Sequence, residues 1–298
     1  MRWLEATALA LSLFVVDDGS PVVHGERYAM GTMFDIVANH SSRDTATRAI
    51  GEALDEVERL DRVLSHFKPE SDLSDLNRRA HNGYVDVAPD LYEVIRQSIE
   101  VSRGSDGAFD VTVAPLVKLW SSARDDGREP TPDQVDAARR CVGYERIELA
   151  PPHRIRYRSD CLAIELGGIG KGYAVDRAIA VLRAAGVTNA VVNGGGSSIT
   201  GIGHDASGNG WPVLLRAGLG EELLLRDASI STSRQDGAII DPRTAAPAPF
   251  TASVTVTAPN ATLADALSTA LVIVSRDDGA RVLRRFPGAS ASYQSDAR

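Results

Sequence analysis

Residues 165–176 read ELGGIGKGYAVD, and they constrain the fold more than any other stretch of the chain. An alternating apolar run at 156–164 precedes them and predicts a strand, and residues 173–185 follow with the period of a helix. The first N–H groups of such a helix have no partner within it, and the helix dipole favours negative charge there. Lys171 adds a positive charge. The junction therefore predicts a site for a phosphate-bearing ligand, with a plain glycine turn as the alternative.

The spacing of the glycines excludes two common nucleotide motifs. A GxxxxGK[ST] loop needs a hydroxyl directly after its lysine, and Gly172 stands there instead. No GxGxxG register of a dinucleotide-binding unit fits residues 167–172 either. A phosphate-bearing ligand would therefore be held by a less common arrangement.

The charge balance argues against a nucleic-acid partner. Lys and Arg total 32 against 40 Asp and Glu, which gives a net charge of −8, and no basic run stands out. Aromatic residues make up 5% of the chain, so platforms for base stacking are not expected. A length of 298 residues with 43% hydrophobic residues is typical of a soluble globular enzyme with one large domain or two smaller ones.

Hydrophobic periodicity predicts a mixed order of helices and strands, which favours an α+β fold, or α/β with irregular connections. The helices are expected at residues 45–67, 89–105, 132–140, 173–185, 261–274 and 279–286. The strands are expected at 22–37 around a turn, 155–164, 190–193, 211–216, 222–225, 229–232 and 252–258. Residues 67–76 and 124–132 are polar and are predicted to be loops.

The N-terminus suggests export. Residues 6–16 form an apolar run that is too short to cross a bilayer, which takes roughly 20 residues, but has the length of a secretory signal core. Residues 1–20 are therefore expected to be a leader, although Glu5 intrudes and a strand or helix of the mature fold is the alternative. No cysteine follows the run, so a lipoprotein anchor is excluded there, and a cytoplasmic location stays open.

The two cysteines, Cys141 and Cys161, are not in a CxxC pair, so a zinc site is not expected. We predict two buried or half-buried thiols, and a disulfide in an oxidising compartment remains the alternative.

Several motifs in order along residues 28–286 resemble the ApbE-type FAD:protein FMN transferases, a family of flavin transferases that use magnesium. The matching stretches are MGTMFDI at 30–36, LSHFKPESDLSDLN at 64–77, GAFDVTVAPLVKLW at 107–120, ELGGIGKGYAVD at 165–176, the glycine segment at 194–201, STSRQDGAIIDPRT at 231–244 and ADALSTAL at 264–271. The resemblance implies a single domain over residues 24–290, built of mixed sheets with packed helices.

The resemblance also implies a reaction. Mg²⁺ would hold the pyrophosphate of FAD, the substrate, while a Ser or Thr hydroxyl of a target protein attacks the phosphorus next to the FMN half. AMP would leave, and FMN would stay on the target as a phosphoester. The implied partners are FAD and a flavin-acceptor protein of a membrane redox complex or an extracytoplasmic electron-transfer system.

The implied metal site lies in the motif at 264–271. Asp265, Ser268 and Thr269 share one helix face at spacings of three and four, and all three offer the oxygen ligands that suit magnesium. By resemblance, Asp265 and Thr269 are side-chain ligands, Ser268 is adjacent to the metal, and the backbone carbonyl of Gly168 is a further ligand. From spacing alone, Asp265 is as readily explained as part of a capping box that begins at Thr262.

The implied flavin site combines apolar and charged residues. By resemblance it is lined by Met30, Phe67, Ala108, Phe109, Asp110, Glu165, Lys171 and Ile240, with Asp265, Lys171 and Glu165 as the catalytic group. Core packing is the alternative for Met30 and Phe67, and a turn cap is the alternative for Asp110. Arg243 is either a second phosphate-facing cation or a surface arginine.

The chain departs from the family pattern at several of these positions. Glu165 stands where Asp is usual, Phe67 where Tyr is usual, Ala238 where His is usual, and Arg234 and Ala245 where Gly is usual. Loss of the histidine would remove a group for proton transfer. The alternative hypothesis is therefore a member that binds FAD, or hydrolyses it to FMN and AMP, without modifying a partner. A non-enzymatic scaffold on the same fold is the third.

Overall fold

The structure, a computed structural model, describes residues 21–214, 222–234, 238–248 and 252–295. The helices are α1 Arg43–Leu64, α2 Asp72–Arg79, α3 Pro89–Gly104, α4 Ala114–Asp125, α5 Pro132–Arg139, the 3₁₀ helix η1 Tyr144–Arg146, α6 Gly170–Ala184, α7 Ala261–Ile273 and α8 Arg276–Leu283. The strands are β1 Val22–Ala29, β2 Thr32–Asn39, β3 Val85–Asp86, β4 Ile147–Ala150, β5 Arg154–Tyr157, β6 Asn189–Gly194, β7 Ser198–Ile202, β8 Trp211–Leu214, β9 Glu222–Leu225, β10 Ala228–Arg234, β11 Ile240–Asp241, β12 Ala246–Pro247, β13 Ala252–Ala258 and β14 Ser290–Ser295.

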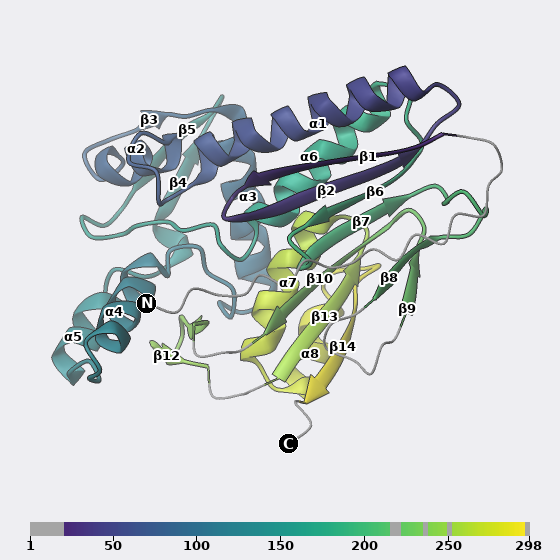
Figure 1. The fold of residues 1–298 in the computed structure, drawn as a ribbon. Helices are drawn as coiled ribbons and strands as arrows, with labels where there is room; N and C mark the ends of the chain where they lie inside the picture. Colours follow the sequence, from purple (N-terminus) through teal and green to yellow (C-terminus); the bar gives the residue numbers. More distant parts are fainter. Residues whose placement is uncertain (1–20, 215–221, 235–237, 249–251, 296–298) are drawn as a thin grey trace.

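A seven-stranded sheet in the order β1-β2-β6-β7-β10-β13-β14 forms the centre of the molecule (Figure 1). Every neighbouring pair in it is antiparallel. Three smaller sheets, β3-β5-β4, β8-β9 and β11-β12, lie outside it. The mixed order of helices and strands confirms the predicted α+β fold class.

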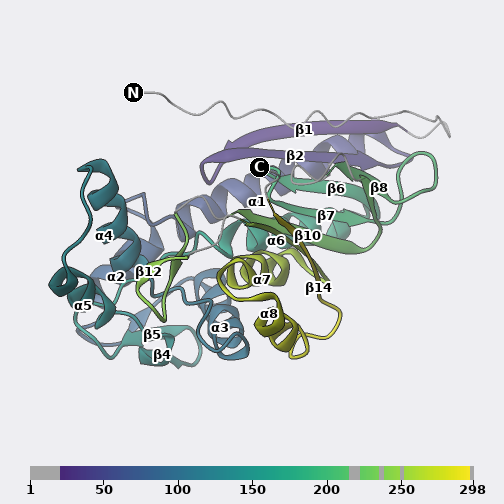
Figure 2. The same cartoon turned by 90° about the horizontal axis from the view of Figure 1, so that it is seen from below.

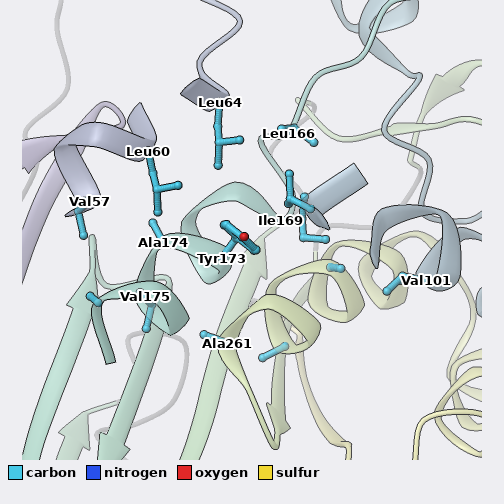
Figure 3. Packing of buried hydrophobic residues seen from close by; sticks show 14 of the residues in the cluster. Val57, Leu60, Leu64, Val101, Leu166, Ile169, Tyr173, Ala174, Val175 and Ala261 are labelled. Atoms are coloured by element: carbon cyan, nitrogen blue, oxygen red, sulfur yellow. The ribbon is translucent and has the colours of Figure 1, made fainter. Parts of the chain in front are cut away.

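Helices α1, α6 and α7 cover one face of the large sheet, as the view from below shows (Figure 2). The apolar residues that recur every three or four positions in α1 are all buried in the main core: Ile50, Leu54, Val57, Leu60 and Leu64. Figure 3 shows side chains of α1 facing Tyr173, Ala174 and Val175 of α6 in this core.

The opposite face of the sheet is covered by the β8–β9 hairpin. Trp211 and Leu225 of the hairpin pack against Val191 and Ile199 in a second hydrophobic cluster. The indole of Trp211 donates a hydrogen bond to the carbonyl of Ile202 at 2.9 Å, so its polar atom is satisfied inside the cluster.

Two local predictions were wrong. The second half of the loop expected at 67–76 belongs to α2, because Ser71 caps the helix by accepting from Ser74 N at 3.0 Å and Leu73 and Leu76 are buried. The strand expected over 155–164 ends at Tyr157.

Residues 158–161 form bends directly after Tyr157, so the strand ladder does not continue past that residue. Farther along, the Asn77 amide accepts from Ile164 N at 2.9 Å and donates to Ile164 O at 2.8 Å, so the backbone of Ile164 itself is paired with a side chain of α2. The expected leader, residues 1–20, lies outside the described residues, and the assignment of residues 24–290 to a single domain stays a prediction. Within the described part of the chain, no helix is both long enough and apolar enough to cross a membrane.

Candidate active site

The site is built where α6 and α7 meet, and each helix caps the other. The carboxylate of Asp176, on α6, accepts from the backbone N–H groups of Ala261 and Thr262 at 2.8 Å each, at the start of α7. The carboxylate of Asp265, on α7, accepts from Gly172 N at 2.9 Å, at the start of α6. Both helices thus have orphan N–H groups satisfied by a negative charge from the other helix.

Gly172 is required by this crossing. A Cβ placed on it would lie 2.2 Å from the carbonyl oxygen of Ala261 and 2.8 Å from Cβ of Asp265. The two helices approach too closely here for any side chain, so position 172 must be a glycine. It cannot carry the hydroxyl that follows the lysine in a GxxxxGK[ST] loop.

The structure removes the capping-box explanation for Asp265. The N-cap of α7 is Asn260, whose side chain accepts from Leu263 N at 2.8 Å, and Thr262 lies inside the helix. Asp265 is buried, with 3% of its surface exposed, and Ser231 Oγ donates to its Oδ1 at 3.1 Å. Its carboxylate is therefore held in place from a neighbouring strand as well as from α6.

Three of the predicted metal-site residues come together. A Cβ on Gly168 would lie 2.9 Å from Thr269 Oγ1, so the backbone of the glycine loop runs directly against α7. Gly168, Asp265 and Thr269 all line one cavity. A carboxylate, a hydroxyl and a backbone carbonyl form an oxygen donor set, which fits Mg²⁺.

Ser268, the fourth predicted residue, lies behind this group. It is fully buried, and its hydroxyl is hydrogen-bonded to Ser233 Oγ at 2.8 Å and to the carbonyl of Asp265 at 2.9 Å. Ser233 also reaches Thr269 Oγ1 at 3.3 Å. Ser268 therefore supports the group through hydrogen bonds and does not line the cavity.

The cavity has a volume of about 340 Å³. Of the predicted residues, it is lined by Ala108, Phe109, Asp110, Glu165, Gly168, Lys171, Ile240, Asp265 and Thr269. The apolar part of its wall is completed by Val111, Val113, Val117, Ile239 and Ile273. An apolar wall thus adjoins a group of oxygen donors within a single cavity.

Lys171 and Glu165 stand at the glycine turn. Lys171 Nζ donates to the carbonyl of Gly167 at 3.5 Å, and Glu165 Oε2 accepts from Gly167 N at 2.9 Å. The side chain of Glu165, one methylene longer than the usual Asp, folds back onto its own turn. Its charge therefore stabilises the loop that carries Gly168. Both side chains are half-buried and can reach a ligand in the cavity.

Asp110 has a structural task as well as a place in the cavity wall. It accepts from Thr112 N at 2.8 Å, from Thr112 Oγ1 at 2.6 Å and from Tyr144 N at 3.0 Å. Burial raises the pKa of Asp110, and these hydrogen bonds oppose the shift. Asp110 therefore caps a turn, as the alternative predicted, and also faces the cavity.

Two predicted flavin contacts lie elsewhere. Met30 occupies the β1–β2 turn with a φ of 51°, and its Cε is 3.9 Å from where a Cβ on Gly170 would be. Phe67 is 83% exposed, and its ring lies 3.8 Å from that of His66. Neither belongs to the described lining of the cavity, and their contact with flavin stays a prediction.

Arg243 lies outside the cavity wall. It donates to both carboxylate oxygens of Asp241 at 2.9 Å, a bidentate pair within its own turn. This geometry favours the second of the two interpretations of Arg243, an arginine held in a surface turn.

The sequence did not single out Asp176, Ser231 or Ser233 as contributors to the site. Asp176 holds the start of α7, and the two serines hydrogen-bond to the metal-site residues from β10. The alternation Ser229, Ser231, Ser233 in β10 is the signal that could have found the two serines, because it places three hydroxyls on one face.

The prediction of free thiols was wrong. Cys141 and Cys161 form a disulfide, with their Cα atoms 5.1 Å apart. The two cysteines are 20 residues apart in sequence. Between them the chain forms η1 and the β4–β5 hairpin and then returns to its starting point, which the sequence did not reveal.

The comparisons with known proteins agree with this architecture. A sequence model described as the ApbE family matches residues 30–293. The FAD:protein FMN transferase of Treponema pallidum is 29% identical over 276 residues, covering 82% of this chain and 76% of that protein. The FAD:protein FMN transferase of Haemophilus influenzae is 27% identical over 309 residues, covering 94% and 88%. Among solved structures, the flavin transferase ApbE from Vibrio cholerae matches with a TM-score of 0.80 at 27% identity, covering 93% of this chain and 98% of that one.

Proposed function

The chain belongs to the ApbE family, and from this premise we propose that it is a transferase that moves the FMN part of FAD onto a Ser or Thr hydroxyl of a target protein. The hydroxyl oxygen forms a bond to the phosphorus next to the FMN half, the bond from that phosphorus to the bridging oxygen breaks, and AMP leaves with that oxygen. The hydroxyl proton passes to solvent water in the same reaction.

One observation carries the proposal: a single cavity joins an apolar wall to the oxygen donors of Gly168, Asp265 and Thr269. The apolar wall suits a flat ring system, and the donors suit the cation that accompanies a pyrophosphate. Lys171 lines the same cavity at the glycine turn, where its positive charge suits negative phosphates, whereas Gly172 N at the start of α6 is already paired with Asp265.

In this proposal the residues of the chain bind and orient. Asp265, Thr269 and the carbonyl of Gly168 would hold Mg²⁺, and Ser231 and Ser233 fix the directions of their oxygens. Bound Mg²⁺ supplies neutralisation of the charge on the pyrophosphate. Lys171 adds charge at the phosphates, and Phe109 with Ile240 excludes water from the ring side of the cavity.

The alternative is a member that binds FAD, or hydrolyses it to FMN and AMP, without modifying a partner. The observation that favours it is Ala238, which lines the cavity where the family has a histidine. A methyl group cannot take up the proton of the attacking hydroxyl, so water and protein hydroxyls would compete on similar terms.

We also propose export to the periplasm or cell envelope. The apolar run at 6–16 and the disulfide both favour an oxidising compartment. The acceptor would then belong to a membrane redox complex or an extracytoplasmic electron-transfer system.

The test is to supply the purified chain with FAD, with and without Mg²⁺, and to measure flavin binding by fluorescence and AMP release by chromatography. Envelope proteins added to the reaction are then separated under denaturing conditions and scanned for covalent flavin. Transfer predicts Mg²⁺-dependent AMP release together with a fluorescent protein band. AMP release without any band would support the hydrolytic alternative, and absence of flavin binding would overturn both.

The variant Ala238→His tests how much the missing histidine limits the reaction. If position 238 serves proton transfer, the variant should raise turnover by about 100-fold or more. Its FAD affinity should stay close to that of the parent chain. Unchanged turnover would remove the argument for the hydrolytic alternative.

A further inference from the structure

One wall of the cavity is a short segment without regular secondary structure. Residues 109–113 run along the cavity and contribute Phe109, Asp110, Val111 and Val113 to its lining. No helix or long strand of the described chain contains this segment, so its position depends on what flanks it.

A first flanking segment, residues 141–144, holds this wall through side chains. Gly143 N donates to Thr112 Oγ1 at 2.8 Å, and Tyr144 N donates to Asp110 Oδ2 at 3.0 Å. Thr112 is fully buried and Asp110 is 7% exposed, so both hydrogen bonds are shielded from water.

A second flanking segment, residues 161–165, holds the same wall through the backbone. Glu165 N donates to the carbonyl of Val111 at 2.9 Å, and Val113 and Ala163 form a parallel bridge. This segment leads directly into Gly167 and Gly168, which line the cavity themselves.

The Cys141–Cys161 disulfide joins the two flanking segments. Between them the chain leaves as η1 and the β4–β5 hairpin, whose stem is closed by a hydrogen bond from Arg158 N to the carbonyl of Arg146 at 2.8 Å. Beyond that stem, the disulfide is the covalent link that keeps the two segments on either side of residues 109–113.

We propose that the Cys141–Cys161 disulfide positions the flavin-binding wall of the cavity, so that opening it lowers the affinity for FAD. The two cysteines are positioning residues, because they act through Asp110, Thr112 and Glu165 and touch no ligand. The inference rests on the proposed function for its ligand but on the described hydrogen bonds for its mechanism.

Opening the bond requires a dithiol reductant. One of its thiolates attacks a disulfide sulfur to form a mixed disulfide, and its second thiol releases the cysteine. Two electrons and two protons pass from the reductant to the protein, giving two cysteine thiols and an oxidised reductant. Cys161 is exposed in the structure, so the bond is accessible to this exchange.

The experiment compares FAD binding by the oxidised and the dithiol-reduced protein in the presence of Mg²⁺. Reduction should weaken FAD binding by at least about fivefold, the lower end of typical coupling between sites. The double variant Cys141→Ser/Cys161→Ser should bind FAD as the reduced protein does, and reductant should not change it. If the double variant does not fold, the reduced parent protein decides.

Hydrogen exchange measured without FAD tests the positioning role of the disulfide independently of the proposed function. On reduction, the amides of Gly143, Tyr144 and Glu165 should lose protection, while that of Val191 in the central sheet should keep it. Unchanged protection of the three amides would overturn the proposal, as would an equal loss throughout the chain or an unchanged FAD affinity. If neither form binds FAD but the three amides lose protection on reduction, the disulfide does position residues 109–113, and it is the proposed function that fails.

Discussion

Two aspartates at the crossing of α6 and α7 look alike in sequence terms and differ in what surrounds them. Asp176 accepts from two backbone N–H groups and from the hydroxyl of Thr262, all at the start of α7. Asp265 accepts from one backbone N–H group and one hydroxyl, and it also lines the cavity. The first carboxylate accepts three hydrogen bonds, all from the start of α7, whereas the second accepts two and has more acceptor capacity left for a ligand in the cavity.

Solvent exposure alone would have pointed to Asp176, and not to Asp265, as the aspartate able to bind a ligand. Asp265 is 3% exposed, while Asp176 is only half-buried, at the edge of a separate cavity of about 630 Å³. What identifies the functional candidate is its place in the cavity lining together with Gly168 and Thr269, which offer further oxygen atoms. The comparison therefore predicts that changes at Asp265 affect chemistry and that changes at Asp176 affect stability.

The largest effect is expected where both aspartates are disturbed together. The variant Gly172→Ala places a methyl group against the backbone of Ala261 and against Asp265, so the helices must separate. We expect a loss of about 3 kcal/mol in the free energy of unfolding, together with weaker FAD and metal binding. Chemical denaturation and flavin fluorescence would measure the two losses.

The matched control is Gly51→Ala, at a half-buried position of α1 where an added Cβ meets no atom within 4 Å. That change should be neutral or stabilise the protein by up to about 1 kcal/mol, because alanine is the better helix former. A similar response in both variants would mean that the close approach of α6 and α7 has no special importance.

The variant Asp265→Asn should separate chemistry from folding. Asparagine keeps an acceptor for Gly172 N but loses the charge, so stability should change little. AMP release should fall by at least about 100-fold. Loss of a residue that only hydrogen-bonds to a metal ligand costs about 10- to 100-fold in metal affinity, and loss of a ligand itself should cost more. Binding of Mn²⁺, followed by electron paramagnetic resonance, would test the metal role directly. Asp176→Asn is the control, and equal Mn²⁺ affinity in both variants would contradict the assignment.

The variant Asp176→Ala should show the opposite pattern. The N–H groups of Ala261 and Thr262 would lose their acceptor at the start of α7, which should cost about 2 kcal/mol of stability. Urea denaturation would measure this loss. The folded variant should keep its Mn²⁺ affinity, since Asp265 retains its own partners, and a large loss of affinity would show that the two helix ends are not independent.

A smaller effect is expected from the hydroxyl that orients Asp265. The variant Ser231→Ala removes the donor to Asp265 Oδ1 and should weaken Mn²⁺ binding by about tenfold. Ser229→Ala is a close control, because Ser229 is equally buried on the same face of β10 but bonds to Thr200. The two variants should lose similar stability, and equal Mn²⁺ affinities would mean that Ser231 has no positioning role.

The sequence predicted the elements whose signal is local. The apolar period of residues 45–67 predicted α1, and strand-type residues around a turn at 22–37 predicted the first hairpin. Helix α2 escaped prediction because it is short and polar on most sides, and it depends on the cap from Ser71 and on two buried leucines. Where stability comes from a cap and from tertiary packing, periodicity carries too little information.

The site divides in the same way. The group of Gly168, Asp265 and Thr269 was predicted from motifs and a family resemblance, and the structure brings the three together. The disulfide was not predicted, nor were the supporting bonds from Asp176 and Ser231, because these pair distant segments through contacts that only the folded chain creates.

The smallest expected effect concerns Asp176: the parent chain and a variant without this carboxylate should differ in how their free energy of unfolding depends on pH. Burial raises the pKa of Asp176 above its ordinary value, although hydrogen bonds from Thr262 and Ala261 oppose the shift. The folded chain therefore binds this proton more tightly than the unfolded chain does. Asp176 then contributes most to stability below its unfolded pKa of about 4, and this contribution is lost as pH rises through the folded-state pKa.

The variant Asp176→Asn cannot titrate, so subtracting its stability from that of the parent isolates this contribution. Measured by urea denaturation at several pH values, the parent's stability relative to the variant should decline as pH rises through the acidic range. A difference that grew with pH would mean that the hydrogen bonds outweigh the desolvation of the carboxylate. In that case Asp176 would be stabilised as an anion by the start of α7, and its contrast with Asp265 would rest on geometry alone.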